Sequence, residues 1–467
     1  MKLDKFLALS AYAVQAIATL GAVFVVSFFL SGQEYGQYSL VVATAQSVAV
    51  LAFEWVRIAA SRFCANDNAS NQDARKHTVQ GAFVLTLLVV AVVGAGLVVL
   101  GGVQPKHALV GSLIATAMGL TDLLLVFLRA RGSFNQFAIL QMARAFTLLA
   151  GAALGAYWGR TADSALIGMC IGYGISTVVY VLAAPIWWIW NPSRHSWSVF
   201  KELARYGLAA AAASNIHLQV PLAVRWVGQS LLSVEAFAGL SLALDILQKP
   251  FALVTSAIGG VLNPGVIVEF ESQKKDKESP KLRQIYEIQV SSVLLILGLA
   301  IAFLPDVAVL LVPSGSAIWL VQFGPAVGCM CALHAILQST VAIPGHLLHA
   351  GARLIANAAV ELALVGLMVG CALIFEAVRP ILWVWLSSVG VVLALIYAAP
   401  LLKLVPCRYP VQAAVTGFVL SVSLSACYFL PAPGLVWMLL LKVVVVSLLV
   451  SAAALYYKRA RQLEAAL

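Results

Sequence analysis

The stretch SLALDILQKPFAL, residues 241–253, places two charges and a proline inside a long apolar segment. Asp245 and Lys249 are four residues apart, so on a helix they share a face and can pair. Pro250 removes a backbone donor and opens the helical hydrogen-bond ladder. Such a segment is very costly when it faces lipid, but it is tolerated beside a hydrated cavity or in a closed clamp between helices. The stretch alone leaves both arrangements open.

The composition decides that the surroundings are a membrane. Of 467 residues, 62% are hydrophobic and 10% are charged, and the mean hydropathy is +0.96. Soluble proteins have about 25% charged residues, so this chain has too few charges to cover a globular surface. The seven cysteines show no zinc-site spacing, and we expect them to be apolar filler. No P-loop lysine or metal-ligand motif occurs in the sequence, so we expect no cofactor, no metal and no ATP hydrolysis.

Apolar runs long enough to span a bilayer recur along the whole chain. They predict an all-α, polytopic membrane protein with about 14 transmembrane helices. The predicted spans are 7–31, 39–61, 78–102, 107–129, 138–158, 165–190, 205–227, 236–258, 286–304, 318–343, 353–375, 381–402, 411–430 and 434–457.

The positive charges predict the orientation. With the N-terminus inside, 21 of the 29 Lys and Arg residues fall on the inner face and three in outer loops, which places both termini in the cytoplasm. The net charge of +10 is therefore a consequence of topology and gives no reason to expect nucleic-acid binding. The longest predicted inner loop is 263–287, and no loop can hold a soluble domain. Any function must lie between the helices.

Two similar segments suggest an internal repeat of six spans. SGQEYGQYSLVVATAQ (31–46) joins the first two spans, and SLLSVEAFAGLSLALDILQ (230–248) joins the seventh and eighth. Halves with an even number of spans keep the same orientation. We therefore predict an N-lobe over 1–200, a C-lobe over 201–403, and two C-terminal helices with a cytoplasmic tail over 404–467.

Charged residues inside the predicted spans are the candidates for function, because each costs a few kcal/mol or more at the bilayer centre. Three of them, Arg57, Arg225 and Glu287, lie within about one turn of a span end and can extend to the headgroups. The full set is Glu54, Arg57, Asp122, Arg144, Arg225, Asp245, Lys249, Glu287, Glu361 and Lys442.

Other polar residues extend this pattern over at least seven spans. His334 and Gln338 are four residues apart, and Arg353, Asn357 and Glu361 form one stripe at the same spacing. A single histidine inside a span is commonly a packing residue. Polar groups in both halves favour a water-filled cavity between two bundles.

The layout of six, six and two spans resembles the polysaccharide-transporter family of the multidrug/oligosaccharidyl-lipid/polysaccharide exporter superfamily, the O-antigen and exopolysaccharide flippases. The resemblance rests on SGQEYGQYSLVVA at the first outer turn and on EAFAGLSLALDI in the second half. It implies two six-helix lobes around a central cavity in the cell inner membrane. It also implies translocation of an undecaprenyl-pyrophosphate-linked oligosaccharide by alternating access.

The resemblance also implies roles for the charged residues. Cations would hold the lipid-linked oligosaccharide, and the candidates are Arg144, Lys249, Arg57, Arg225, His334 and Arg353. Acids would couple transport to H⁺ or Na⁺, and the candidates are Asp245, Glu361 and Asp122. Membrane lipids and other membrane proteins of polysaccharide assembly are the expected partners.

Three other functions remain as alternatives. An ion-coupled exporter of drugs or metabolites would keep the fold and change the cargo, and a cavity rich in acids would favour it. A membrane polymerase or ligase would need a sizeable outer loop, which the sequence lacks, so we expect no enzyme. A purely structural scaffold leaves the polar groups inside the spans unexplained.

Overall fold

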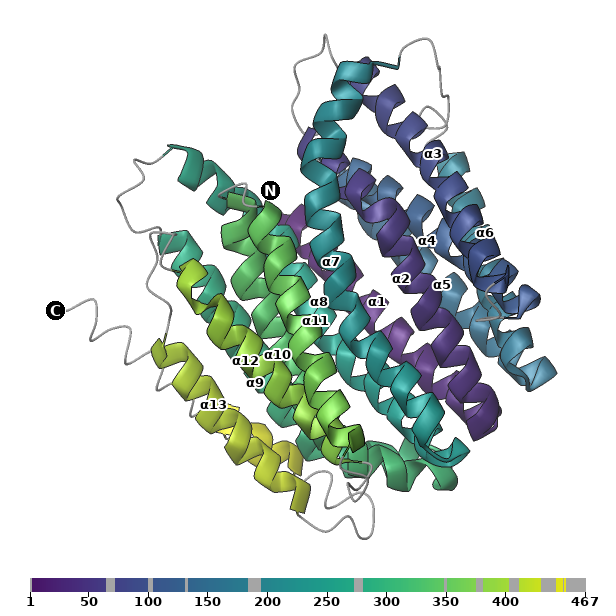
Figure 1. The fold of residues 1–467 in the computed structure, drawn as a ribbon, viewed down its shortest axis with the longest axis vertical. Coiled ribbons are helices and arrows are strands. Elements are labelled where there is room, and N and C mark those ends of the chain that lie inside the picture. Colours follow the sequence, from purple (N-terminus) through teal and green to yellow (C-terminus); the bar gives the residue numbers. More distant parts are fainter. Residues whose placement is uncertain are drawn as a thin grey trace, which may run out of the picture. The chain divides into compact units, whose positions relative to one another are not determined.

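A computed structural model gives the fold of the protein (Figure 1). It describes residues 2–63, 72–99, 104–130, 133–183, 195–272, 280–347, 351–374, 381–402, 411–429, 442–447 and 449–450.

The described residues form thirteen α-helices, one short 3₁₀ helix and no strands, which confirms the all-α, polytopic class. The fourteenth predicted span, 434–457, lies largely outside the described residues. The helices are α1 (Lys2–Phe29), α2 (Gly32–Phe63), α3 (Gln72–Val99), α4 (Pro105–Ala130), α5 (Phe134–Gly159), α6 (Ala162–Ala183), α7 (Trp197–Leu231), α8 (Val234–Ser272), α9 (Pro280–Leu311), α10 (Ser314–Leu347), α11 (Gly351–Ile374), α12 (Leu382–Leu402), α13 (Val411–Ser425) and η3 (Ala426–Phe429).

Several helices extend beyond the apolar runs that predicted them. Ser31 begins α2 as its N-cap: its Oγ accepts a hydrogen bond from Glu34 N at 3.4 Å, and its carbonyl accepts one from Tyr35 N. Ser233 begins α8 in the same way. Capping residues, which hydropathy ignores, thus turn the predicted outer turns into helix. The predicted inner loop 263–287 was also wrong, because 263–272 and 280–287 are helical.

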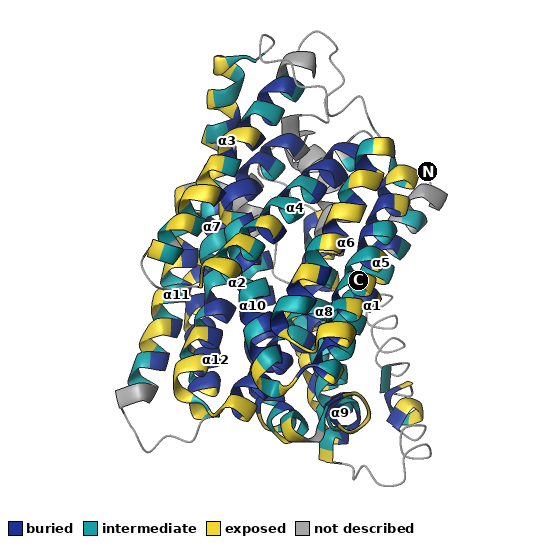
Figure 2. Ribbon diagram, turned by 90° about the vertical axis from the view of Figure 1, so that its right-hand side faces the viewer, coloured by how far each residue is buried: buried dark blue, intermediate teal, exposed yellow. Residues whose placement is uncertain are grey.

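The helices expose apolar side chains to the outside of the bundle, as a lipid-facing surface requires. Exposed and buried residues share the same helices in Figure 2, and α3 is a clear example. On α6 the exposed residues recur every three or four positions and include Ile167, Ile171, Ile175 and Leu182. Together with the thirteen candidate spans, this surface identifies a multi-pass membrane protein.

The chain divides into two compact units. Unit 1 comprises Met1–Leu242 and Leu348–Ala363, and unit 2 comprises Ala243–Leu347 and Leu364–Leu467. The division passes through α8 and α11, so each of these helices contributes to both units.

Unit 1 is held together by close helix contacts. A Cβ atom added at Gly151 or Gly155 of α5, or at Gly168 or Gly172 of α6, would clash with backbone atoms of the opposite helix. These glycines therefore let α5 and α6 approach closely. Gly207 allows α7 the same approach to the backbone of α2 at Trp55.

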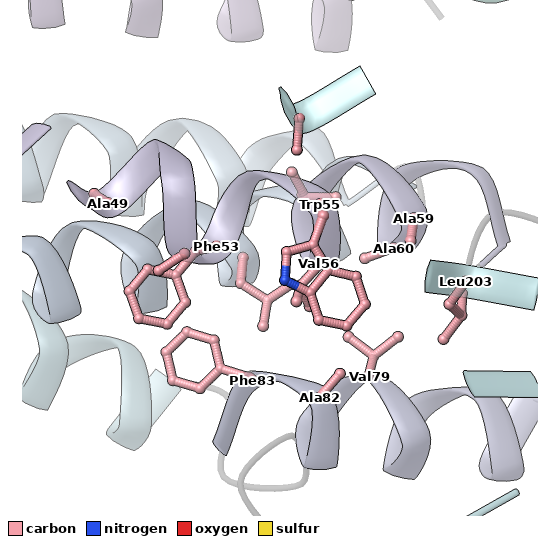
Figure 3. Packing of buried hydrophobic residues seen from close by; sticks show 14 of the residues in the cluster. Ala49, Phe53, Trp55, Val56, Ala59, Ala60, Val79, Ala82, Phe83 and Leu203 are labelled. Carbon is pink, nitrogen blue, oxygen red and sulfur yellow. The ribbon is translucent and has the colours of Figure 1, made fainter. Parts of the chain in front are cut away.

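An apolar cluster fills the space between α2, α3, α4 and α7 in unit 1. Phe53 and Phe83 stack with their ring centroids 4.8 Å apart, and Figure 3 shows these rings facing one another. Trp55, Val79 and Leu203 extend the cluster toward the start of α7. This core fixes the positions of α2 and α4, which carry much of the charge described below.

Unit 2 packs α9 against α10 and α13, and α10 against α12. One ion pair is fully enclosed in it. Lys442 Nζ donates to Asp306 Oδ2 at 2.7 Å, and both side chains are at least nine-tenths buried. This pair attaches the segment 442–447 to α9.

Candidate functional site

Arg144, in the middle of α5, is a buried arginine held by two residues of α4. Its Nη1 donates hydrogen bonds to Asp122 Oδ1 at 2.6 Å and to Thr121 Oγ1 at 3.0 Å. The Arg144 side chain is 10% exposed, and that of Asp122 is 33% exposed. Because a guanidinium in apolar surroundings needs a hydrogen-bonded counter-charge, Asp122 makes it possible for Arg144 to lie inside the bundle.

Arg57 lies on α2, next to the same acid. Its guanidinium forms an ion pair with Glu54, one turn earlier in the helix. The Asp122 carboxylate also attracts Arg57, and the hydroxyl group of Tyr12 lies nearby. Asp122 therefore acts on two arginines that come from different helices.

Arg129 adds a third guanidinium, which was not among the site residues predicted from the sequence. It donates a hydrogen bond from Nη1 to the hydroxyl oxygen of Tyr12 at 2.8 Å and lies 6.0 Å from the centroid of the Phe137 ring. Within the described part of the chain, no carboxylate forms an ion pair with Arg129. Its position in the last turn of α4 suggested a topological charge, and the contact that changes this interpretation comes from α1.

These residues form one group, which we call the arginine cluster: Tyr12, Glu54, Arg57, Asp122, Arg129 and Arg144. Three guanidinium groups face two carboxylates, so the cluster carries one net positive charge. Further hydrogen-bonding capacity lies one turn from Arg144, where Gln141 donates from Nε2 to Gln15 Oε1. Gln141 Oε1 and the Tyr180 hydroxyl are buried and make no hydrogen bond with the described residues. Several guanidinium groups in one place suit the oxygens of a phosphate.

A second polar group joins α7 to α11 within unit 1. His217 Nδ1 contacts the Glu361 carboxylate, and their side chains are 7% and 0% exposed. One turn before Glu361, Asn357 donates from Nδ2 to the carbonyl of Arg353 at 2.7 Å. Its Oδ1 is buried and accepts no hydrogen bond from the described residues. Glu361 and this acceptor lie on one stripe of α11, as the spacing predicted.

Polar contacts also line the packing of α7 on α2. Gln219 Nε2 donates to Ser47 Oγ at 2.7 Å, and Asn215 Nδ2 donates to the carbonyl of Ser47 at 3.1 Å. Arg225 donates to Ser39 Oγ and is 2% exposed. The expectation that Arg225 extends to the headgroups was wrong, because α2 covers its guanidinium.

Four further candidates lie on α8, α10 and α11. Arg353 is exposed at the start of α11 in unit 1. In unit 2, Asp245 and Lys249 are half-buried on α8, and each has interaction partners. His334 is buried on α10 and shares a 2.9 Å hydrogen bond with Gln338, one turn away. Within unit 1, the structure brings the predicted site residues Arg57, Asp122 and Arg144 into one group.

No protein-family model and no curated protein matches the sequence. Solved structures do match the fold. Lipid II flippase MurJ in an inward closed conformation superposes with a TM-score of 0.67 at 10% identity, over 98% of this chain and 99% of that chain. The MATE multidrug transporter DinF-BH in complex with rhodamine 6G gives 0.60 at 11% identity, over 86% and 94%. The Vibrio cholerae MATE transporter VcmN in its bent form gives 0.55 at 15% identity, over 89% and 97%.

The fold is that of MurJ and the MATE transporters. Other MATE transporters that match this chain are described as members of the MOP superfamily. The predicted fold class, an all-α polytopic membrane protein, is thereby confirmed. The matched structures named here are flippases or transporters and not enzymes.

The arginine cluster predicts strong coupling between Asp122 and Arg144. In a double-mutant cycle of Asp122→Asn and Arg144→Gln, we expect a coupling free energy of about 0.5–3 kcal/mol, because either single change leaves a charge unpaired. The free energy of unfolding is measured by detergent titration in mixed micelles, with circular dichroism as the signal.

The matched control is the exposed ion pair of Lys106 and Asp163, whose side chains are 56% and 35% exposed. A cycle of Lys106→Gln and Asp163→Asn should give less than about 1 kcal/mol. A coupling at Asp122 and Arg144 no larger than in this control would contradict the account of the cluster.

Proposed function

We propose that this protein is a flippase that moves an undecaprenyl-pyrophosphate-linked oligosaccharide across the cytoplasmic membrane for surface polysaccharide synthesis. The observation that carries the proposal is the arginine cluster inside a membrane-spanning bundle. A pyrophosphate carries negative charges that must lose water on the way through an apolar slab, and guanidinium groups replace that water with charge-assisted hydrogen bonds.

The carboxylates of the cluster have a defined part in this mechanism. Asp122 and Glu54 stabilise the guanidinium groups when no phosphate is bound. When a pyrophosphate enters the cluster, its oxygens replace these carboxylates as the partners of the guanidinium groups. Arg129 already lacks a carboxylate partner within the described residues. The exchange keeps the guanidinium groups of Arg57 and Arg144 paired both with and without the phosphate, which lowers the cost of binding and release.

Transport itself requires alternating access, which we propose as rocking of residues 1–200 against 201–403. Such a movement exposes one polar site first to the cytoplasm and then to the outer leaflet. A solved structure of similar fold is a lipid II flippase, which supports a lipid-linked cargo for this fold. The polysaccharide-transporter family, with undecaprenyl pyrophosphate as the carrier lipid, is the narrower assignment that we propose.

For the coupling ion we propose the proton, with Glu361 and His217 as the pair that binds it. An imidazole and a carboxylate in direct contact and nine-tenths buried can share or release one proton without leaving an isolated charge. Asp122 and Asp245 remain further proposed coupling groups, and a Na⁺ ion is the alternative that the experiment below separates.

One observation favours a second function, the export of cationic drugs. Two of the three arginines are neutralised by acids, and Asp122 is one-third exposed. A solved structure of similar fold is a multidrug transporter in complex with rhodamine 6G. In this case Asp122 and Glu54 would bind the cargo, and the arginines would compete with it.

Loss of cationic charge from the cluster should stop flipping. In proteoliposomes, Arg129→Ala combined with Arg144→Ala should lower the initial rate by about tenfold or more, because each charged hydrogen bond contributes about 1.5–3 kcal/mol. The rate is measured with an undecaprenyl-pyrophosphate oligosaccharide that bears a fluorescent sugar, as the fraction accessible to an impermeant glycosidase.

Arg205→Ala is the matched control, because Arg205 is exposed on α7 and should leave the rate unchanged. Size-exclusion chromatography confirms that all variants fold. Normal flipping by the double variant would contradict the proposal. If the wild-type protein leaves the glycolipid in place but exports rhodamine 6G, the second function is correct.

Glu361→Gln should separate cargo binding from coupling. We expect the increase in flipping rate caused by an imposed pH gradient to fall about tenfold. The affinity for the labelled glycolipid should change less than about threefold, because neither residue of the pair belongs to the arginine cluster. The matched control is Glu202→Gln, an exposed carboxylate on α7. A rate that follows a Na⁺ gradient at constant pH would overturn the assignment of the proton.

A further inference from the structure

A cavity of about 220 Å³ lies in unit 1 among α2, α3, α4 and α7. None of its lining residues belongs to the arginine cluster. It lies near the start of α2 and α4 and the end of α7, which the charge distribution predicts to be the outer end of these helices. Its polar lining includes Gln37, Gln104, His107, Ser112, Trp226 and Gln229.

The lining combines apolar and uncharged polar groups. Leu40, Val41, Ala45 and Val48 of α2 provide an apolar wall, and amide, hydroxyl, indole and imidazole groups provide the polar part. No Asp, Glu, Lys or Arg of the described chain lines the cavity. The cavity therefore offers hydrogen bonds and carries no formal charge in its lining unless His107 is protonated.

Three of these polar side chains, Gln104, Trp226 and Gln229, are exposed. Gln37, Gln104, Ser112, Trp226 and Gln229 make no side-chain hydrogen bond within the part of the chain that the structure describes. Ligand sites have a small number of such groups on an apolar background, since the polar groups orient a ligand that the apolar surface holds.

Charged residues nearby pair with one another instead. Asp163 of α6 accepts hydrogen bonds from Lys106 and from His107 Nε2, the latter at 3.0 Å. Glu34 of α2 accepts one from the backbone N–H of Ala162 at the start of α6. These contacts join the ends of α2, α4 and α6, so one side of the cavity is positioned before any ligand arrives.

We infer that this cavity binds an uncharged sugar residue. The apolar wall and the Trp226 indole suit the C–H face of a pyranose ring, and the three glutamines and Ser112 can donate to and accept from its hydroxyl groups. A charged group would lose its water here without a counter-charge. A bare acyl chain would leave the amides that it covers unpaired.

That this sugar belongs to the transported glycolipid rests on the proposed function. The site would hold a neutral sugar near the outer end of the bundle, apart from the guanidinium groups that hold the pyrophosphate. Neutral and acidic sugar units would then be distinguished at this cavity, whereas the arginine cluster would accept the pyrophosphate of both.

Photolabelling tests the inference without transport. The probe is octyl β-glucoside with a diazirine on the sugar ring, applied to the full-length protein in phosphatidylcholine nanodiscs. We expect saturable labelling of residues 104–112 and 226–229, read by mass spectrometry. Octyl glucoside should displace the probe, and octyl glucuronide and octanol should not. Equal displacement by octanol would show an acyl-chain site and overturn the inference, as would equal displacement by the glucuronide or labelling that does not saturate.

Two neighbouring residues supply a matched pair of variants. Ala108→Trp fills the cavity and should lower labelling by about tenfold or more, whereas Leu109→Trp changes an exposed residue of the same helix turn and should not. Gln37→Ala and Gln229→Ala should each raise the half-saturating probe concentration by about fivefold, the effect of one neutral hydrogen bond. Unchanged labelling in folded Ala108→Trp would overturn the inference.

The two proposals fail separately. Arg129→Ala with Arg144→Ala should leave labelling unchanged, because neither arginine lines the cavity. Saturable, sugar-specific labelling of a protein that does not flip the glycolipid would refute the proposed function and retain the sugar site. Flipping without such labelling would refute the sugar site alone.

Discussion

A guanidinium group inside an apolar helix bundle must have a partner for its charge, and the arrangement of unit 1 follows from this requirement. Asp122 provides that partner for Arg144 directly and acts on Arg57 from the same position. The acid therefore acts on arginines of two helices, and removing it would leave Arg144 without a carboxylate partner among the described residues. A site of this kind is stable when it is closed, and it can open only for a ligand that brings equivalent negative charge.

Helix packing determines where these charges can meet. The glycines of α5 and α6 bring the two backbones into contact, which fixes the helix that carries Arg144. The aromatic pair of Phe53 and Phe83 sets α2 against α3 in the same unit. Because the charged residues lie on helices that are positioned by contacts with small and aromatic residues, the cluster has a defined geometry. Precise placement of this kind is what phosphate recognition requires.

The sequence predicted those features that depend on one helix at a time. Apolar runs predicted the thirteen candidate membrane helices that the structure describes. Helical spacing placed Asn357 and Glu361 on one stripe of α11. Features that depend on a second helix were missed. Arg129 gained its significance from Tyr12 on α1, and Arg225 is covered by Ser39 on α2. Hydropathy contains no information on such partners, and it also ignores the serine caps that extend α2 and α8.

The central claim is that the arginine cluster binds the pyrophosphate of a lipid carrier. Equilibrium binding of undecaprenyl pyrophosphate and of uncharged undecaprenol to the protein in nanodiscs, followed by native mass spectrometry, tests it most directly. The account predicts that the pyrophosphate binds at least about tenfold more tightly than the alcohol, a difference of about 1.4 kcal/mol, and that the preference disappears when Arg129 and Arg144 are both alanine. Equal affinity for the two lipids, or a preference that survives the loss of both arginines, would contradict it.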